Sequence, residues 1–338
     1  MSKKPFGVLP TGEQAYLYTI CCGAVEAKIS DYGALLVSLM VPDKNGKLDD
    51  VVLGYDDAPG YAASTVYLGA TVGRNSNRIG NARFTLNGTT YTLAGNDNGH
   101  NLHSGDCYCY RMWQVQEHTA SKLVLALTSP DGDQGFPGQA QIQVTYALEE
   151  PGTLVITYDG ICDADTVFNM TNHSYFNLAG HDHPEKAMDQ ILQMNATFFN
   201  PDDALSIPNG ELRSVEGTPM DFRTPKAIGR DINQDYEALN FQGGYDHNFE
   251  VFCNPCAILS DPVSGRTMSV VTDCPGVQFY AGNYLNNEPG KDGVTYTRRS
   301  GICLETQYYP DAVNRPEWAQ PIFKAGQRYH SETRYIFG

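Results

Sequence analysis

The chain has 338 residues, with 23 Lys and Arg against 39 Asp and Glu, so its formal net charge is −16. This charge argues against nucleic acid as a partner, because phosphate backbones are bound by basic patches, and against an anionic membrane surface. No apolar run is long enough to cross a bilayer, and the N-terminus lacks the apolar stretch of a signal peptide. The nine cysteines are an odd number at irregular spacings, so we expect reduced thiols in a cytoplasmic protein.

Strand patterns dominate the chain. Only 18% of the residues are charged, while 33 glycines, 19 prolines and 21 tyrosines favour short strands joined by tight turns. Short apolar or alternating runs predict strands, in chain order, at residues 15–21, 24–30, 34–41, 84–93, 123–128, 141–148, 153–159, 187–194, 247–252, 257–260, 267–272, 277–280 and 301–306.

Two turns and one helix complete these predicted elements. Asn87-Gly88 divides residues 84–93 into a hairpin, because a type I′ turn needs positive φ at both central residues. Residues 149–152 (EEPG) lie between two further strand patterns and predict a second hairpin. Residues 231–239 are the best helix candidate, with Asp231 as its cap. A dozen or more strands and almost no helix indicate an all-β fold of sandwiched antiparallel sheets. With no repeat or linker visible, we expect residues 1–338 to form a single domain.

Two loop-like segments carry polar groups that a sheet surface does not need. Residues 73–80 (GRNSNRIG) hold two arginines and two asparagines, which suit a hydroxylated or anionic ligand. An arginine that pins a turn through backbone carbonyls is an equally good interpretation of this segment. Residues 99–105 place His100 and His103 among glycine and asparagine, as in a binding loop. Two surface histidines would be the simpler interpretation of that segment alone.

Two further segments hold groups suited to acid–base chemistry. Within residues 168–180, His173 lies among many hydrogen-bonding neighbours, and histidine transfers protons near neutral pH. Glu305 follows an apolar Ile-Cys-Leu run, so burial is expected to raise its pKa and make it a general base. A structural histidine and a paired structural acid are the alternatives. Asp246 after a glycine turn and Gln278 on a strand add polar groups.

These segments together resemble the aldose 1-epimerase (galactose mutarotase) family. The matching stretches come in the family's order and cover almost the whole chain. They are GRNSNRI (73–79), NLHSG (101–105), DGDQGFPG (131–138), TNHSYFNLAG (171–180), YDHNF (245–249), VQFYAGN (277–283) and LETQYYPDAVN (304–314). No single stretch is decisive, but seven in order make the match specific.

The resemblance implies a large antiparallel β-sandwich, a galactose mutarotase-like supersandwich, with a carbohydrate cleft. It implies an isomerase that interconverts the α and β anomers of free aldohexoses of the galactose or glucose type. His173 would be the general acid and Glu305 the general base. Substrate-binding roles are implied for Asn77, Arg78, His103, Tyr175, Asp246 and Gln278, and Asn177 would support the site.

Ring opening in such a reaction requires one acid, one base and no redox step, so we expect no cofactor and no metal. The base takes the proton of the C1 hydroxyl while the acid protonates the ring oxygen. We expect Glu305 to start ionised and His173 to start protonated, with Asp246 helping to keep a histidine charged. His103 and Arg78 would stabilise negative charge on oxygen. Four aromatic residues of the motifs suit a sugar site, and at least half of them are expected to belong to the core instead: Tyr175, Phe176, Phe279 and Tyr280.

The chain departs from the family pattern at three places. The family commonly has His-Gly-Gly where this chain has His103-Ser104-Gly105, and a small residue where Ser76 stands. Residues 106–113 (DCYCYRMW) have no clear counterpart. Because we expect this last segment to border the cleft, the preferred aldose stays open.

Other functions remain possible at this point. Asp246 and Glu305 could form the carboxylate pair of a glycoside hydrolase, although the prominent His173 argues against it. The same polar residues could belong to a non-catalytic carbohydrate-binding module. A hexose-phosphate mutarotase would need additional arginines for the phosphate. The scarcity of basic residues favours a neutral sugar, although three arginines leave the question open: Arg74, Arg78 and Arg111.

Two cysteine pairs raise the question of a zinc site. Cys107 and Cys109 are spaced too closely for the usual zinc knuckle, and Cys253 and Cys256 form a lone CxxC. The two pairs could bind zinc only if the fold brought them together. A redox role of the CxxC is also disfavoured, because no helical pattern follows it.

Overall fold

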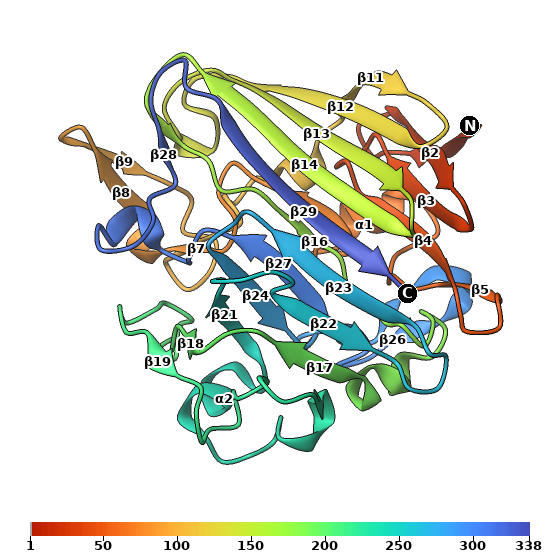
Figure 1. Ribbon diagram of the computed structural model, residues 1–338. Helices are drawn as coiled ribbons and strands as arrows, with labels where there is room; N and C mark the ends of the chain where they lie inside the picture. The colour runs from red at the N-terminus through yellow and green to blue at the C-terminus, as the bar shows by residue number, and fades with distance from the viewer. Residues whose placement is uncertain (1) are drawn as a thin grey trace.

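The structure is a computed structural model that describes residues 2–338. Its largest element is a nine-stranded antiparallel sheet, in which the long strands β12, β13, β14 and β29 lie side by side (Figure 1). In spatial order its strands are β11 (Gln114–His118), β12 (Lys122–Ser129), β13 (Ala140–Glu149), β14 (Thr153–Cys162), β29 (Tyr329–Phe337), β23 (Thr267–Thr272), β22 (Ala257–Ser260), β17 (Ile191–Met194) and β20 (Lys226–Ala227).

Two five-stranded sheets complete the main architecture. The first is an N-terminal meander of β1 (Ser2–Val8), β2 (Gln14–Cys22), β3 (Val25–Ser30), β4 (Leu36–Pro42) and β5 (Leu48–Asp50). The second has the order β19 (Arg213–Ser214), β18 (Phe198–Phe199), β21 (Asp246–Glu250), β24 (Gly276–Tyr280) and β27 (Cys303–Gln307). The predicted all-β sandwich of antiparallel sheets is confirmed.

Short elements connect these sheets. The two-stranded ribbons pair β6 (Ala70–Val72) with β16 (Thr171–His173), β7 (Arg78–Ile79) with β10 (Asn101–Leu102), β8 (Arg83–Leu86) with β9 (Thr89–Thr92), β15 (Thr166–Val167) with β28 (Ile322–Phe323), and β25 (Glu288–Pro289) with β26 (Thr295–Tyr296). The α-helices are α1 (Ala58–Ala63) and α2 (Glu237–Gln242). Within residues 2–338, no helix has the length and apolar character needed to cross a membrane.

One hydrophobic core joins the three sheets. Leu39 of β4, Val144 of β13 and Phe279 of β24 are all buried in the same cluster. Burying an apolar side chain of this size contributes about 1.5–3 kcal/mol. The sheet of β21, β24 and β27 therefore packs one face against the core, which leaves its other face for polar groups.

Strand alternation sorts the side chains of β21, β24 and β27. Successive side chains point to opposite faces, and the apolar residues on one face (Phe249, Val277, Phe279 and Leu304) are buried in the core. The other face receives Asp246, Asn248, Gln278, Tyr280, Cys303, Glu305 and Gln307. In the register of the ladders, Gln278 lies opposite Glu305, and Asp246 lies opposite Tyr280.

Both predicted hairpins are confirmed. Asn87 and Gly88 connect β8 to β9 with φ of 52° and 79°, the left-handed values that a type I′ turn requires. Residues 149–152 connect β13 to β14, with Gly152 at φ 52°.

Two predicted elements are wrong in part. The helix begins at Glu237 rather than at Asp231, because the Asp231 carboxylate accepts hydrogen bonds from Lys226 Nζ at 2.8 Å and from Arg230 and does not cap a helix. Of the strand predicted at 187–194 only the second half forms, since residues 184–189 make 3₁₀ turns that begin at Pro184.

Candidate active site

A cavity of about 140 Å³ lies over the polar face of β21, β24 and β27. It brings together eight of the nine site residues that the sequence predicts. The residues that line it are Thr65, Val66, Tyr67, Asn77, Arg78, Leu102, His103, His173, Tyr175, Asp246, Gln278, Tyr280, Tyr284 and Glu305.

His173 and Glu305 face each other across the floor of this cavity. His173 Nε2 lies 3.6 Å from Glu305 Oε1, and the two side chains are 7% and 3% exposed. The ladder between β6 and β16 holds the backbone of His173, and β27 holds that of Glu305. An imidazole and a carboxyl group at this distance, out of water, can share one proton between them.

The protonation of this pair differs from the expectation. Burial lowers the pKa of His173 to about 4, whereas burial, followed by the charge of Asp246, raises the pKa of Glu305 well above its usual range. In the ligand-free protein the shared proton is therefore held by Glu305, and His173 is neutral. The predicted direction of the Glu305 shift is correct, but the starting state of an ionised Glu305 and a charged His173 is not favoured.

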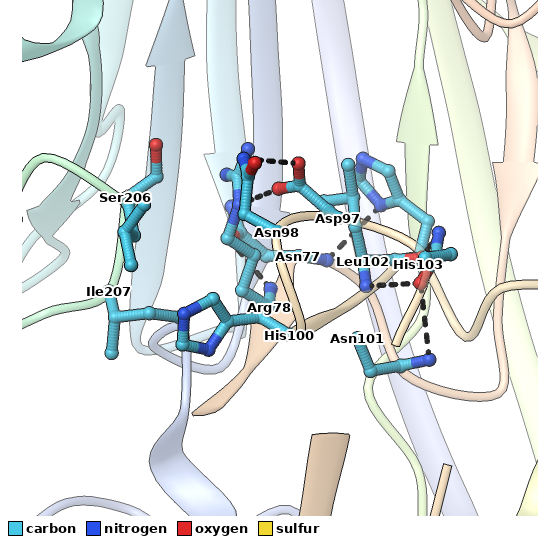
Figure 2. A network of polar contacts seen from close by, with 12 residues as sticks. Asn77, Arg78, Asp97, Asn98, His100, Asn101, Leu102, His103, Ser206 and Ile207 are labelled. Atoms are coloured by element: carbon cyan, nitrogen blue, oxygen red, sulfur yellow. Dashed lines mark hydrogen bonds and ion pairs between the residues drawn. The ribbon is translucent and has the colours of Figure 1, made fainter. Parts of the chain in front are cut away.

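Two backbone bonds fix His103 beside Asn77. The backbone N–H of Asn77 donates to His103 Nδ1 at 3.2 Å, and the N–H of His103 donates to the carbonyl of Asn77 at 3.0 Å (Figure 2). Burial lowers the pKa of His103 well below its usual range, so the ring is neutral. Because Nδ1 accepts, the proton of the neutral ring lies on Nε2. His103 is thus a fixed hydrogen-bond donor.

Arg78 supplies the positive charge of the site. Its Nε donates to Asp97 Oδ2 at 2.8 Å (Figure 2). The side chain of Arg78 is 13% exposed. The charges of Asp246 and Asp97 raise the pKa of the guanidinium despite its burial. The adjacent Asn77 accepts the backbone N–H of Arg78 with its side-chain oxygen at 2.8 Å. Arg78 is therefore a permanent cation in a predominantly acidic cavity.

Asp246 and Gln278 form a hydrogen-bonded pair on neighbouring strands. Gln278 Nε2 donates to Asp246 Oδ1 at 2.8 Å. Burial raises the pKa of Asp246, while the charge of Arg78 and the bond from Gln278 act against this shift. A fixed amide beside a fixed carboxyl group is well suited to binding vicinal hydroxyls.

Aromatic side chains make up much of the remaining wall. Tyr175 donates its hydroxyl to the carbonyl of Val66 at 2.8 Å, and its ring centroid lies 5.1 Å from that of His173. Of the four motif aromatics, Tyr175 and Tyr280 line the cavity, whereas Phe176 and Phe279 belong to the core. The expectation that at least half of them are core residues is confirmed.

Sequence reasoning missed Tyr67. Its ring centroid lies 4.7 Å from that of His103 and 5.8 Å from that of His173, so it packs against both histidines. Tyr67 has φ 59°, a value that is strained for a bulky side chain and often marks functional sites. That strain is a property of the backbone, which a single sequence does not display. Tyr284, 57% exposed at the mouth, was missed as well.

Asn177 does not reach the cavity. Its Nδ2 donates to the carbonyls of His183 and Ser300, and its Oδ1 accepts from Gln190 Nε2 at 2.8 Å. Because these contacts satisfy its amide, Asn177 holds together the chain around the site and is not available to a ligand.

The loops at residues 73–80 and 99–105 contain both structural residues and residues that line the cavity. Arg74 is fully buried, and its guanidinium donates to the carbonyls of Pro137 and Gly138, so it pins a turn. Arg78 instead lines the cavity. His100 is buried outside the cavity and accepts the backbone N–H of Asn81 at 2.9 Å.

The departures from the family pattern are accommodated locally. Ser104 adopts φ 64°, a region that favours glycine, and its hydroxyl donates to the carbonyl of Asn75 at 3.0 Å. Residues 106–113 do not line the cavity, which corrects our expectation that they border it. Tyr110 of this segment lies behind Tyr67, with the ring centroids 6.3 Å apart.

Three side chains in the cavity have residue types that commonly bind metal ions. One ligand atom each of His103, His173 and Glu305 lies within 4.8 Å of the others, in a set of two imidazoles and a carboxylate that metalloenzymes use. A metal-bound histidine normally donates its second ring N–H to an acceptor. His103 does the reverse, because its Nδ1 accepts from Asn77 and its Nε2 keeps the proton. The set does not fit a resident metal, and within residues 2–338 no cysteine belongs to such a group.

The comparisons with known proteins decide the family. The sequence matches the model of the family described as aldose 1-epimerase over residues 16–336. The chain belongs to the aldose 1-epimerase family. It is 41% identical over 319 residues to aldose 1-epimerase of Haemophilus influenzae, which covers 93% of this chain and 92% of that protein. It is 37% identical over 343 residues to galactose mutarotase of Bos taurus, which covers 100% of this chain and 98% of that protein.

Solved structures agree with this aldose 1-epimerase assignment. A homologue of the aldose epimerases from C. elegans superposes with a TM-score of 0.89 at 30% identity, covering 96% of this chain and 99% of that one. Galactose 1-epimerase from Lactobacillus acidophilus gives a TM-score of 0.87 at 25% identity, covering 100% and 98%. The predicted family, fold and enzyme class are confirmed: the protein is an isomerase of the aldose 1-epimerase type.

Proposed function

We propose that this aldose 1-epimerase interconverts the α and β anomers of a free aldohexose, with His173 as general acid and Glu305 as general base. The observation that carries these roles is the 3.6 Å contact between His173 Nε2 and Glu305 Oε1 in a buried polar cavity. Glu305 takes the proton of the C1 hydroxyl, the bond from C1 to the ring oxygen breaks, and His173 protonates that oxygen. After rotation about C1–C2, the reverse transfers close the ring on the other face. Each transfer is worth roughly 10²–10⁴-fold in rate.

The electrostatics of the pair support ring opening. Opening starts from ionised Glu305 with charged His173 and ends with both groups neutral. Burial disfavours the charged form of each group, so the neutral pair that accompanies the open-chain aldehyde is stabilised relative to the ion pair. The ion pair forms when the proton of Glu305 passes to His173, which leaves the net charge of the cavity unchanged.

Six other residues are proposed to hold the sugar. They are Asn77, Arg78, His103, Tyr175, Asp246 and Gln278, all of which line the cavity. His103 and Arg78 are positioned donors, which suits them to a sugar oxygen that gains negative charge. Asp246 and Gln278 offer an acceptor and an amide to neighbouring hydroxyls. Asn177 is proposed only to support the chain around them.

The charge balance favours a neutral sugar over a hexose phosphate. Of the three arginines considered for phosphate, Arg74 is consumed by buried carbonyls, and Arg111 binds Asp133 at 2.5 Å and Asp106 at 2.8 Å. Arg78 alone remains in the cavity, and its neighbours are carboxyl groups. A phosphate would meet more negative than positive charge there. The names of the relatives make galactose the first substrate to test.

We also propose that residues 1–338 act as a single domain. Support comes from β29 near the C-terminus, which pairs with β14 in mid-chain, and from the core cluster that spans all three sheets.

Polarimetry tests the proposed reaction. Crystalline α-D-galactose is dissolved at mildly acidic pH, where spontaneous mutarotation is slow, and optical rotation is followed with and without the protein. We expect acceleration that Glu305→Gln and His173→Asn each lose while both variants stay folded. Acceleration kept by a folded variant would refute the assigned role. No acceleration with galactose, glucose, xylose or arabinose would refute the neutral-aldose assignment, and assays with a hexose phosphate, a sugar titration and an aryl glycoside would then separate the alternatives.

A further inference from the structure

The second ring nitrogen of His173 contacts a thiol. Cys303 Sγ lies 3.6 Å from His173 Nδ1, on the side of the ring away from Glu305. Cys303 and Glu305 are two residues apart on β27, so the pleat of the strand directs both side chains to the same face. The imidazole is therefore held between two groups of one strand, and Cys303 is fully buried.

The thiol stays protonated in this position. Burial, then the charges of Glu305 and Asp246, raise the pKa of Cys303 well above its usual range. A neutral thiol is a weak donor through S–H and a weak acceptor through sulfur. Its sulfur can accept from Nδ1–H of a neutral imidazole and of an imidazolium alike, without a change in its own charge.

We propose that Cys303 is a positioning residue that holds neutral His173 in the tautomer with its proton on Nδ1, which leaves the lone pair of Nε2 directed at the cavity. In the neutral ring one nitrogen donates and the other accepts. When the sulfur accepts from Nδ1–H, the lone pair of the neutral ring lies on Nε2, the atom 3.6 Å from Glu305 Oε1. Nε2 is thereby free, before the substrate binds, to take the proton of Glu305 and then to deliver it to the sugar. The consequence for catalysis rests on the proposed function, whereas the tautomer itself does not.

A thiol also has an advantage over a carboxylate at this position. A carboxylate on Nδ1 would stabilise the imidazolium and make it a weaker acid. The other titratable groups that surround the ring are Glu305 on β27, His103, Tyr67, Tyr175 and Tyr280. Among them only Glu305 adds a negative charge next to the ring. Cys303 orients His173 without adding a second one, so the imidazolium releases its proton readily to the ring oxygen.

Nitrogen NMR of the histidine rings tests the tautomer directly. The protein is labelled with ¹⁵N-histidine at pH 8, and the His173 signal is identified by its loss in His173→Asn. We expect wild-type His173 to be the neutral Nδ1–H tautomer and Cys303→Ala to show a mixture of tautomers. An Nε2–H tautomer or an imidazolium in the wild type would overturn the proposal, as would an unchanged tautomer in Cys303→Ala. If the alanine variant does not fold, Cys303→Ser is used and is expected to keep the Nδ1–H form, because its hydroxyl oxygen also accepts from Nδ1–H.

Kinetics give a second readout. Losing one weak hydrogen bond is expected to lower kcat of Cys303→Ala about five- to tenfold and to change KM by less than about twofold. Cys274→Ala is the matched control, because Cys274 is a buried cysteine in the loop between β23 and β24 without contact to His173. We expect the control to keep wild-type kcat and the wild-type His173 signal. Equal kcat in the two variants would overturn the positioning role. If the protein had no mutarotase activity, the proposed function would fail, but the NMR experiment would still decide the tautomer of His173.

Discussion

Gln307 Nε2 donates to Gln278 Oε1 at 3.1 Å and thereby fixes which end of the Gln278 amide faces Asp246. Because its oxygen is occupied, Gln278 presents its NH₂ group to Asp246, to which it donates at 2.8 Å. Gln307 Nε2 also donates to Asn248 Oδ1 at 3.1 Å. The three amides are buried on the same face of β21, β24 and β27. A chain of directed amides thus runs along this face from Asn248 through Gln307 and Gln278 to the carboxyl group of Asp246.

Replacing Gln307 by Met is predicted to weaken sugar binding more than chemistry. The variant keeps the side-chain length but leaves the acceptors of Gln278 and Asn248 unpaired, at about 1–3 kcal/mol each. The Gln278 amide is then free to flip, so we expect KM to rise at least about fivefold while kcat falls less than about threefold. Steady-state polarimetry separates the two constants. Gln307→Glu, which has the same shape but no N–H, is expected to behave alike; wild-type KM in both variants would contradict the prediction.

The sequence predicts which side chains lie on this face of the sheet better than it predicts which of them form hydrogen bonds with each other. The motif LETQ, read as a strand, already places Glu305 and Gln307 on one face by its period of two. The partner of Gln307 depends on the register between β24 and β27, which no local pattern encodes. Pairing over long sequence separations is likewise what brings His173 opposite Glu305. The resemblance to a family predicted that His173 and Glu305 share one site, which residue patterns alone could not predict.

The failures of prediction have local physical causes. Asp231 has the residue type of a helix cap, but a buried ion pair with Lys226 competes for its carboxylate. Asn177 lies within a motif of site residues, but its amide is consumed by backbone carbonyls. Tyr67 carries no motif, and its importance comes from a left-handed backbone that places it against two histidines. Tertiary contacts determine each of these outcomes.

The activity of this isomerase is predicted to persist at unusually acidic pH. The working pair holds exactly one proton between His173 and Glu305. A second proton enters on His173 with a pKa of about 4, while Glu305, with its raised pKa, still holds its own, and the base is lost. The acid limb of kcat/KM is therefore expected near pH 4 rather than near 6.5, the value of an ordinary histidine. Polarimetry between pH 3.5 and 8 measures it, and an acid limb near 6.5 would contradict the prediction.

The basic limb of the same profile is predicted to respond to Asp246. Loss of the last proton from the pair requires Glu305 to ionise beside the carboxyl group of Asp246, whose charge raises the pKa of Glu305. Asp246→Asn removes that charge, so the basic limb is expected at lower pH than in the wild type, whatever the loss in overall activity. The position of the limb, not the rate, is the readout. A limb that does not move would show that Asp246 has no electrostatic influence on Glu305.

Removing Asp97 is predicted to disturb Arg78. Asp97 accepts from Arg78 Nε at 2.8 Å in a partly buried ion pair. Asp97→Ala releases the guanidinium from this orientation, and the cost of a lost charge-assisted bond is about 1.5–3 kcal/mol. We expect KM for galactose to rise about tenfold or more. Asp106→Ala is the control, since Asp106 pairs with Arg111 but is 73% exposed, and it is expected to change KM less than about twofold. Similar effects of the two substitutions would contradict a specific role of Asp97.

His247 is predicted to make folding sensitive to acid. Its ring is buried next to Phe199 on the core side of β21, and burial lowers its pKa to about 3. The unfolded chain binds a proton at His247 below about pH 6.5 but the folded chain does not, so the stabilising contribution is present above 6.5 and is lost as pH falls towards 3. Between pH 6.5 and 5 this amounts to about 2 kcal/mol. Urea unfolding at both pH values is therefore expected to show a smaller loss of stability for His247→Leu than for the wild type. Because all other titrating groups are shared, parallel losses in the two proteins would mean that His247 is protonated in the folded state.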